Sequence, residues 1–226
     1  MTNISWNKER YELLKACNHL VEAGLVTGSS GNVSMKLNTT RNSLVLITPQ
    51  GLNLAKLDPG NLCLIDLEGE PIEEVIPPSS ETAIHLSIYK ARPDINSIIH
   101  SHPIYSSVIS VHGKELPPLL DEMVLKIGGS VHISEYAFPG TNQLATNVIQ
   151  ALGNRMAVIL RNHGLLTVGE SLENALDNSL LTERLAQIFL YTSLLNGVNP
   201  LPKEIIDIEK ELYQMRKLSR ENQGGC

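Results

Sequence analysis

Two histidines separated by a single residue are the feature of this sequence most suited to chemistry. His100 and His102 close the β-branched apolar run 96–101, and side chains two apart on a strand point to the same face. A third imidazole would complete the three-ligand set of a catalytic zinc site, with the fourth position open to water or substrate. We expect His163 to supply it, because it ends another strand-like run and precedes Gly164, which allows a close turn.

The pair alone fits equally well with two structural histidines at a strand edge, because histidine is often a half-buried structural residue. The chain has 7 histidines, and the remaining ones lie in helical, turn or isolated contexts without metal-ligand spacing. We expect structural roles for these: His19, His85, His112 and His132.

Glu81 is the candidate general acid or base. It follows two serines at the expected start of a helix, where the helix dipole stabilises an ionised carboxylate and so suits a base that must be unprotonated at neutral pH. Taken alone, it is also compatible with an ordinary acidic residue in a first helical turn.

The segment 28–32, Gly-Ser-Ser-Gly-Asn, offers backbone N–H groups, hydroxyls and an amide that could bind a phosphate without lysine. An ordinary turn between a helix and a strand has the same composition. A dinucleotide site is not indicated, because a helical pattern precedes this segment and a strand pattern follows it.

The elements that must position these residues alternate between helical and strand-like patterns. Helical spacing of apolar residues predicts helices over 7–23, from Glu81 to about Lys90, and over 171–195 and 202–220. Alternating or β-branched runs predict strands over 33–37, 44–48, 62–67, 72–75, 96–101, 156–160 and 165–168. Hairpin-like spacings in the first half favour antiparallel pairing, so the fold class is mixed α and β.

The composition limits the classes of protein that are compatible with the chain. Its 226 residues, 42% hydrophobic, are compatible with one domain spanning 1–226. A net charge of −6 without clustered cations disfavours a nucleic-acid partner. Neither a signal segment nor an apolar run of about 20 residues is present, so we expect a cytoplasmic protein without membrane contact. We expect no disulfide framework from its three cysteines, which are Cys17, Cys63 and Cys226.

Six segments, in the same order along the chain, resemble the class II aldolase/adducin family and, within it, the zinc-dependent L-fuculose-1-phosphate aldolase group. They extend over nearly the whole sequence, which makes the resemblance more specific than any single motif. The segments are 28–34, 46–51, 78–81, 92–94, 99–102 and 162–165.

The resemblance implies roles for individual residues. It implies that His100, His102 and His163 bind one Zn²⁺ per subunit and that Glu81 is the catalytic acid/base. Five positions match residues that bind the substrate phosphate in the aldolases: Ser29, Asn32, Gly51, Ser79 and Ser80. Gln50 departs from the threonine often found before that glycine.

Two further positions are less closely matched. Tyr213 falls near a C-terminal tyrosine that reaches a neighbouring subunit's site in the bacterial aldolase, and an amphipathic-helix residue is an equal alternative. Where the fuculose aldolase has a catalytic tyrosine, this chain reads Leu120-Asp-Glu-Met-Val124. Glu122 in that segment resembles the acid/base glutamate of the related methylthioribulose-1-phosphate dehydratases, and a surface helix acid is an equal alternative.

The resemblance implies a central, mainly antiparallel sheet flanked by helices in three layers, assembled as a homotetramer with sites at subunit interfaces. It implies a lyase that reversibly cleaves a ketose 1-phosphate, such as L-fuculose 1-phosphate or a similar deoxy-ketose phosphate, to dihydroxyacetone phosphate and an aldehyde. The alternatives are a sugar-phosphate dehydratase acting through Glu122, a non-catalytic adducin-like binding protein and an epimerase. Glu81 favours the lyase, because related epimerases tend to carry aspartate there and the dehydratases typically lack the Ser-Ser-Glu motif.

Overall fold

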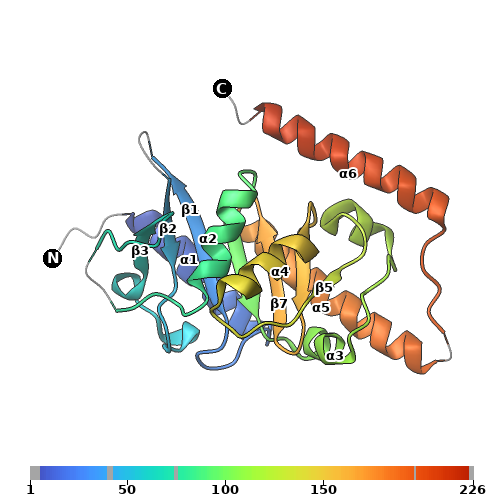
Figure 1. Ribbon diagram of the computed structural model, residues 1–226, viewed down its shortest axis with the longest axis horizontal. Helices are drawn as coiled ribbons and strands as arrows, with labels where there is room; N and C mark the ends of the chain where they lie inside the picture. The colour runs from blue at the N-terminus through green and yellow to red at the C-terminus, as the bar shows by residue number, and fades with distance from the viewer. Residues whose placement is uncertain (1–5, 40–42, 74–75, 196, 224–226) are drawn as a thin grey trace.

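The computed structural model describes residues 6–39, 43–73, 76–195 and 197–223. Seven strands in these ranges form one sheet with the order β3-β2-β1-β4-β7-β6-β5 (Figure 1). All neighbouring strands are antiparallel except β5 and β6, which are parallel. The mixed α and β class with a mainly antiparallel sheet is therefore confirmed. The strands are β1 (Asn32–Asn38), β2 (Ser43–Ile47), β3 (Cys63–Asp66), β4 (Ser97–Ser101), β5 (His132–Ser134), β6 (Ala157–Leu160) and β7 (Gly164–Gly169).

Helices cover both faces of this sheet, which gives three layers. In Figure 1, α2 and α4 lie in front of the sheet, and α1 and α5 lie behind it. A π-helical turn, Met123–Ile127, contacts α6, which lies away from the sheet at one end of the molecule. The helices are α1 (Asn7–Glu22), α2 (Thr82–Ala91), α3 (Ile104–His112), α4 (Asn142–Leu152), α5 (Leu172–Leu194) and α6 (Lys203–Gln223), with short 3₁₀ turns at Leu54–Lys56 and Pro59–Asn61.

The core consists of two apolar clusters that together cover both faces of the sheet. The smaller one packs around α1, and the larger one includes residues of α2, α4 and α5. Because successive strand residues point to opposite faces, Ile98 packs with α2 and α4, whereas its neighbour Ile99 packs with α1. Both residues are fully buried. The central strands are thus enclosed on both faces, and polar side chains placed among them must find partners inside the protein.

Most predicted elements are present within a few residues of their expected bounds. The predicted strand 72–75 is wrong where it can be described, because Ile72 and Glu73 form a bend beside a single bridge from Ile65 to Pro71, and its last two residues lie outside the described ranges. Cys17 and Cys63 are free buried thiols, as expected, and Cys226 lies outside the described residues.

None of the helices in the described ranges has both the length and the apolar character needed to cross a bilayer.

The connection between β4 and α3 is fixed by a carboxylate from α5. Glu183 accepts hydrogen bonds from the backbone N–H of Tyr105 and from the N–H and hydroxyl of Ser106, each at 2.8 Å. These N–H groups belong to the first turn of α3, which has no intrahelical acceptors for them. Since α3 starts two residues after His102, this carboxylate restrains the chain directly beside a candidate metal ligand.

We expect Glu183→Ala to lower the free energy of unfolding by about 1–2 kcal/mol, because it removes a charged cap from two backbone donors and one hydroxyl. Urea denaturation measures the change. Glu211→Ala, at an exposed position of α6, is the matched control and should change the stability by less than about 0.5 kcal/mol. Equal stabilities of the two variants would contradict the capping role.

Candidate metal centre and active site

Three imidazoles from two parts of the chain meet at one end of the central strands. His100 lies on β4, His102 directly follows that strand, and His163 lies in the turn between β6 and β7. Their ring centroids are 4.7 to 5.2 Å apart, and one ligand atom from each lies within 4.8 Å of the others. The structure therefore brings together the three residues that the sequence indicates as ligands.

The hydrogen bonding of His100 fixes which of its nitrogens can bind a metal. Its Nδ1 lies 2.9 Å from the carbonyl oxygen of Leu165. A carbonyl can only accept, so Nδ1 carries the proton and Nε2 presents its lone pair, at 2.8 Å from Nε2 of His102. A backbone acceptor on the second nitrogen is typical of metal-binding histidines.

The local environment favours the neutral form of His100 and His102. Burial, together with His102 and His163, lowers the pKa of His100 well below its ordinary value. Burial and then His163 lower the pKa of His102, while Glu81 partly opposes the change. Neutral imidazole is the form that binds metal, so a cation need not displace protons from these two rings at neutral pH.

The carboxylate of Glu81 lies against the same cluster. Glu81 is the N-cap residue of α2 and is only 7% exposed. One oxygen, Oε2, lies 3.1 Å from Nε2 of His100 and accepts a 2.9 Å hydrogen bond from the Asn32 amide. The other, Oε1, lies 3.4 Å from Nε2 of His163 and has no hydrogen-bond partner among the described residues.

This donor set fits a zinc ion. A buried carboxylate is costly unless it is paired with a cation or fully hydrogen-bonded, and Oε1 of Glu81 lacks a hydrogen bond. Three imidazoles offer nitrogen ligands of the kind that zinc prefers, and the carboxylate beside them would compensate the charge of the ion. A cation between the rings would satisfy the unpaired oxygen and use the lone pair that His100 presents.

Close backbone approach explains why the turn after His163 requires glycine. A Cβ at Gly164 would lie 2.5 Å from Cδ2 of His102 and 2.5 Å from the carbonyl oxygen of Ser101. Asn162, which precedes His163, has the left-handed φ of 53° that asparagine tolerates better than most residues. The turn can therefore place His163 beside the histidine pair only with a residue that lacks a side chain at 164.

The loops that carry the predicted phosphate-binding residues lie next to one another. The backbone N–H of Ser79 donates to the Thr48 carbonyl at 3.1 Å, and the N–H of Leu54 donates to the Gly28 carbonyl at 3.2 Å. These bonds join segment 48–54 to the loops on both sides of it. The structure thus brings the five predicted residues to one region near the start of α2.

Within that region the side chains differ in their contacts. Asn32 is buried and donates to Glu81, and the Ser79 hydroxyl accepts a 3.3 Å hydrogen bond from the backbone N–H of Glu81. The other predicted phosphate-binding residues are exposed and open to a ligand: Ser29, Gly51 and Ser80. Asn32 is thus tied to the candidate base as well as to the loop.

Glu122 does not join the cluster in this chain. It lies at the start of the π-helical turn, and its carboxylate forms a close ion pair with Arg184 on α5. Among the described residues, this arginine rather than the histidines is its partner.

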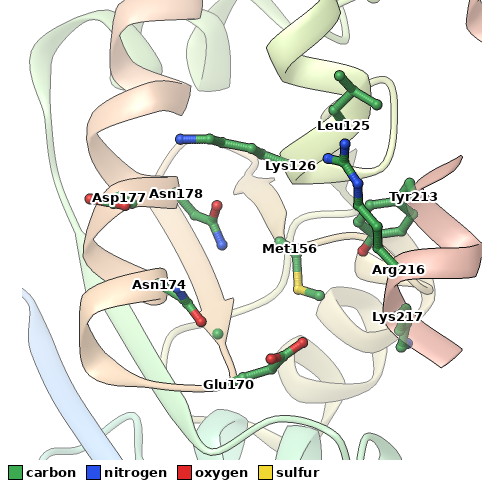
Figure 2. A pocket seen from close by; sticks show the side chains of 11 residues that line it. Leu125, Lys126, Met156, Glu170, Asn174, Asp177, Asn178, Tyr213, Arg216 and Lys217 are labelled. Atoms are coloured by element: carbon green, nitrogen blue, oxygen red, sulfur yellow. The ribbon is translucent and has the colours of Figure 1, made fainter. Parts of the chain in front are cut away.

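Tyr213 lies on α6 and also points elsewhere. Its hydroxyl donates to the Asn154 carbonyl at 3.0 Å, and Figure 2 shows it beside Arg216 and Lys217 in a pocket between α6 and the start of α5. Burial raises the pKa of Tyr213 to about 12. None of the three histidines lines that pocket.

One residue that we expected to be merely structural is connected to the site. His85 is fully buried, and its Nε2 lies 2.6 Å from Oδ1 of Asn32. The sequence does carry a signal for this role, because Glu81, His85 and Tyr89 recur at intervals of four and so share one face of α2. Glu81 and His85 contact Asn32 on β1, and Tyr89 contacts Ser34 on the same strand.

Comparisons with known proteins agree with this geometry. The family described as Class II Aldolase and Adducin N-terminal domain matches residues 11–190. The L-fuculose phosphate aldolase of Escherichia coli (strain K12) is 33% identical over 209 residues, covering 92% of this chain and 95% of that protein. The 5-deoxy-D-ribulose 1-phosphate aldolase of Bacillus thuringiensis serovar kurstaki is 33% identical over 197 residues, covering 87% and 91%. A solved L-fuculose 1-phosphate aldolase superposes with a TM-score of 0.87 at 31% identity, covering 95% of this chain and all of that one.

We expect Gly164→Ala to weaken zinc binding by about tenfold or more, because the added methyl must displace the His102 ring or the Ser101 carbonyl. Titration against a coloured zinc chelator measures the affinity. Gly24→Ala is the control, because Gly24 also lies in a turn but a Cβ there has no neighbour within 4 Å. Equal zinc affinity in both variants would contradict the close-packing argument.

Proposed function

Since the chain belongs to the class II aldolase and adducin family, we propose that it is a zinc-dependent aldehyde lyase that reversibly cleaves a ketose 1-phosphate. The products are dihydroxyacetone phosphate and an aldehyde. The observation that carries the proposal is the Glu81 carboxylate, which lies 3.1 Å from His100 and 3.4 Å from His163 inside a buried cluster. A pure binding protein has no need for a buried base beside three clustered imidazoles.

His100, His102 and His163 are the proposed zinc ligands. A zinc ion bound there supplies a Lewis acid for the oxygens of the substrate. The tautomer of His100, fixed by the Leu165 carbonyl, supports its assignment as a ligand through Nε2.

Glu81 is the proposed proton carrier at C3 of the substrate. In the cleavage direction, the C4 hydroxyl loses its proton and the C3–C4 bond breaks. The aldehyde leaves with C4, and the electron pair stays on the three-carbon fragment as an enediolate. In the cleavage direction Glu81 must enter this step protonated from solvent, and it delivers that proton to C3, which completes dihydroxyacetone phosphate. In the direction of synthesis the ionised Glu81 removes the same proton.

A second group must accept the proton from the C4 hydroxyl. In this chain Glu122 is paired with Arg184 and Tyr213 with the Asn154 carbonyl, so neither supplies that group to its own histidines in this arrangement. We propose that Tyr213 acts from a neighbouring copy in a homotetramer, with Glu122 as the alternative.

The phosphate is proposed to bind where the loops around Ser29, Gly51 and Ser80 meet. Exposed hydroxyls and backbone N–H groups there suit a dianion. Anchoring the phosphate on C1 fixes the position of the substrate in the site and so holds C3 near Glu81.

The relatives narrow the proposed substrate. Those cited above are named as aldolases of L-fuculose phosphate and of 5-deoxy-D-ribulose 1-phosphate. Both compounds are ketose 1-phosphates that end in a methyl group. We therefore propose a deoxy-ketose 1-phosphate as the substrate class.

We expect Glu81→Gln to keep its zinc but lose about a hundredfold or more in kcat, because the amide cannot carry the proton at C3. His102→Ala should lose both zinc and turnover, because it removes a ligand. Metal analysis of the purified variants, together with a coupled assay for dihydroxyacetone phosphate, measures both quantities. Undiminished cleavage by the metal-free protein would contradict the mechanism.

The products separate the lyase from the dehydratase. We expect L-fuculose 1-phosphate or 5-deoxyribulose 1-phosphate to yield two carbon fragments, detected by mass spectrometry as triose phosphate and an aldehyde. A single product lighter by one water would identify the dehydratase instead. Zinc-loaded protein that leaves every ketose 1-phosphate unchanged would support the binding-protein alternative.

A further inference from the structure

A line of buried polar side chains leads from Glu81 into the core between α2 and β1. The Asn32 amide lies 2.9 Å from Oε2 of Glu81, and its oxygen lies 2.6 Å from Nε2 of His85. Nδ1 of His85 lies 2.7 Å from the Ser34 hydroxyl, which in turn lies 2.7 Å from the hydroxyl of Tyr89. Four short hydrogen bonds thus connect the proposed base to a tyrosine two helical turns away.

The direction of every bond in this line follows from the first one. An ionised carboxylate can only accept, so the amide nitrogen of Asn32 faces Glu81 and its oxygen faces His85. That oxygen needs a donor, so Nε2 of His85 carries the proton and Nδ1 presents a lone pair. Ser34 must then donate to Nδ1, and its oxygen accepts from the Tyr89 hydroxyl.

Regular secondary structure holds these residues in place. Glu81, His85 and Tyr89 are spaced by four residues on α2 and share one face of the helix, while Asn32 and Ser34 are two apart on β1 and share one face of the sheet. His85 and Ser34 are 0% exposed. Water therefore cannot replace a missing partner without a cavity being opened.

The environment of His85 permits a single hydrogen-bonding state. Burial, and then the neighbouring His100, lower its pKa to about 3 despite the opposing effect of Glu81. A neutral ring between a hydroxyl donor and an amide oxygen has one tautomer that satisfies both partners. If the Asn32 amide turned over, its oxygen would face the carboxylate and its nitrogen would face the N–H of His85.

We propose that His85 is a positioning residue for the proton-transfer step. Its Nε2–H holds the Asn32 amide in the orientation that anchors Oε2 of Glu81, and this leaves Oε1 directed at His163. The role is distinct from metal binding, because His85 contacts none of the three proposed ligands through a hydrogen bond in the described structure. It rests on the proposed function, since it concerns how Glu81 is oriented for catalysis.

Paired substitutions at His85 give the kinetic test. His85→Leu removes the donor at similar size, and His85→Gln keeps an N–H near the place of Nε2. We expect zinc-loaded His85→Leu to lose about tenfold to a hundredfold in kcat with less than about a threefold change in KM. His85→Gln should recover most of the lost kcat, and His19→Leu, at an exposed position of α1, should match the wild type.

Zinc content and the melting temperature of each variant accompany the kinetics. Wild-type kcat in folded, zinc-loaded His85→Leu would overturn the proposal, as would a loss in His85→Gln equal to that in His85→Leu. If His85→Leu does not fold, Ser34→Ala tests the hydrogen bond between the Ser34 hydroxyl and Nδ1 of His85. A drop in the kcat of this variant without loss of zinc supports the proposal, and an unchanged kcat overturns it.

A spectroscopic measurement separates this inference from the proposed function. Two-bond ¹H–¹⁵N correlations of the zinc-loaded wild type should show His85 protonated at Nε2 and unprotonated at Nδ1 from about pH 5 to pH 9. Protonation at Nδ1 would overturn the positioning role even in an active aldolase. A wild type without cleavage activity but with the expected tautomer would refute the proposed function and leave the hydrogen-bond assignment intact.

Discussion

The structure of the site depends on one buried negative charge. The Glu81 carboxylate is nearly excluded from water, and an ionised group in that position must be compensated locally. One of its oxygens takes a hydrogen bond from Asn32, and the other faces His163 without a hydrogen bond in the described structure. The proposed cation among the imidazoles would supply the compensation that this carboxylate lacks, and the carboxylate in turn accepts the Asn32 amide.

The centre of the sheet is the part of the fold that can meet this requirement. Asn32 on β1 and His100 on β4 are paired in the antiparallel register, so their side chains are neighbours on one face of the sheet. The turn between β6 and β7 delivers His163 to the end of the same strands, and α2 begins at Glu81 above that face. Four separate segments thus converge, and the apolar clusters on both faces hold them rigid.

Local patterns explain which parts of this arrangement could be predicted from the sequence. The spacing of His100 and His102 and the helix start at Glu81 are determined by residues close in the chain, so both can be predicted from local sequence and both are present in the structure. His85 was missed because its partners lie on β1, more than fifty positions away, and its spacing from Glu81 on the helix does not by itself identify them. No helix was predicted for α3 or α4, although Leu144, Val148 and Leu152 of α4 recur at helical spacing and are buried. The assembly that would place Tyr213 is not encoded in a local pattern.

A neutral histidine at position 85 serves the proposed chemistry better than a cation would. A lysine or arginine beside Asn32 would orient the amide equally well, but its positive charge would compete with the metal for the charge of Glu81. A line of neutral hydrogen bonds adds no net charge, and each bond polarises the next toward the carboxylate. Oε2 is then held in place while Oε1 keeps a lone pair uncommitted by any hydrogen bond in the described structure. That division, one oxygen to fix the group and the other to carry the proton, is what a base needs when it must be both immobile and basic.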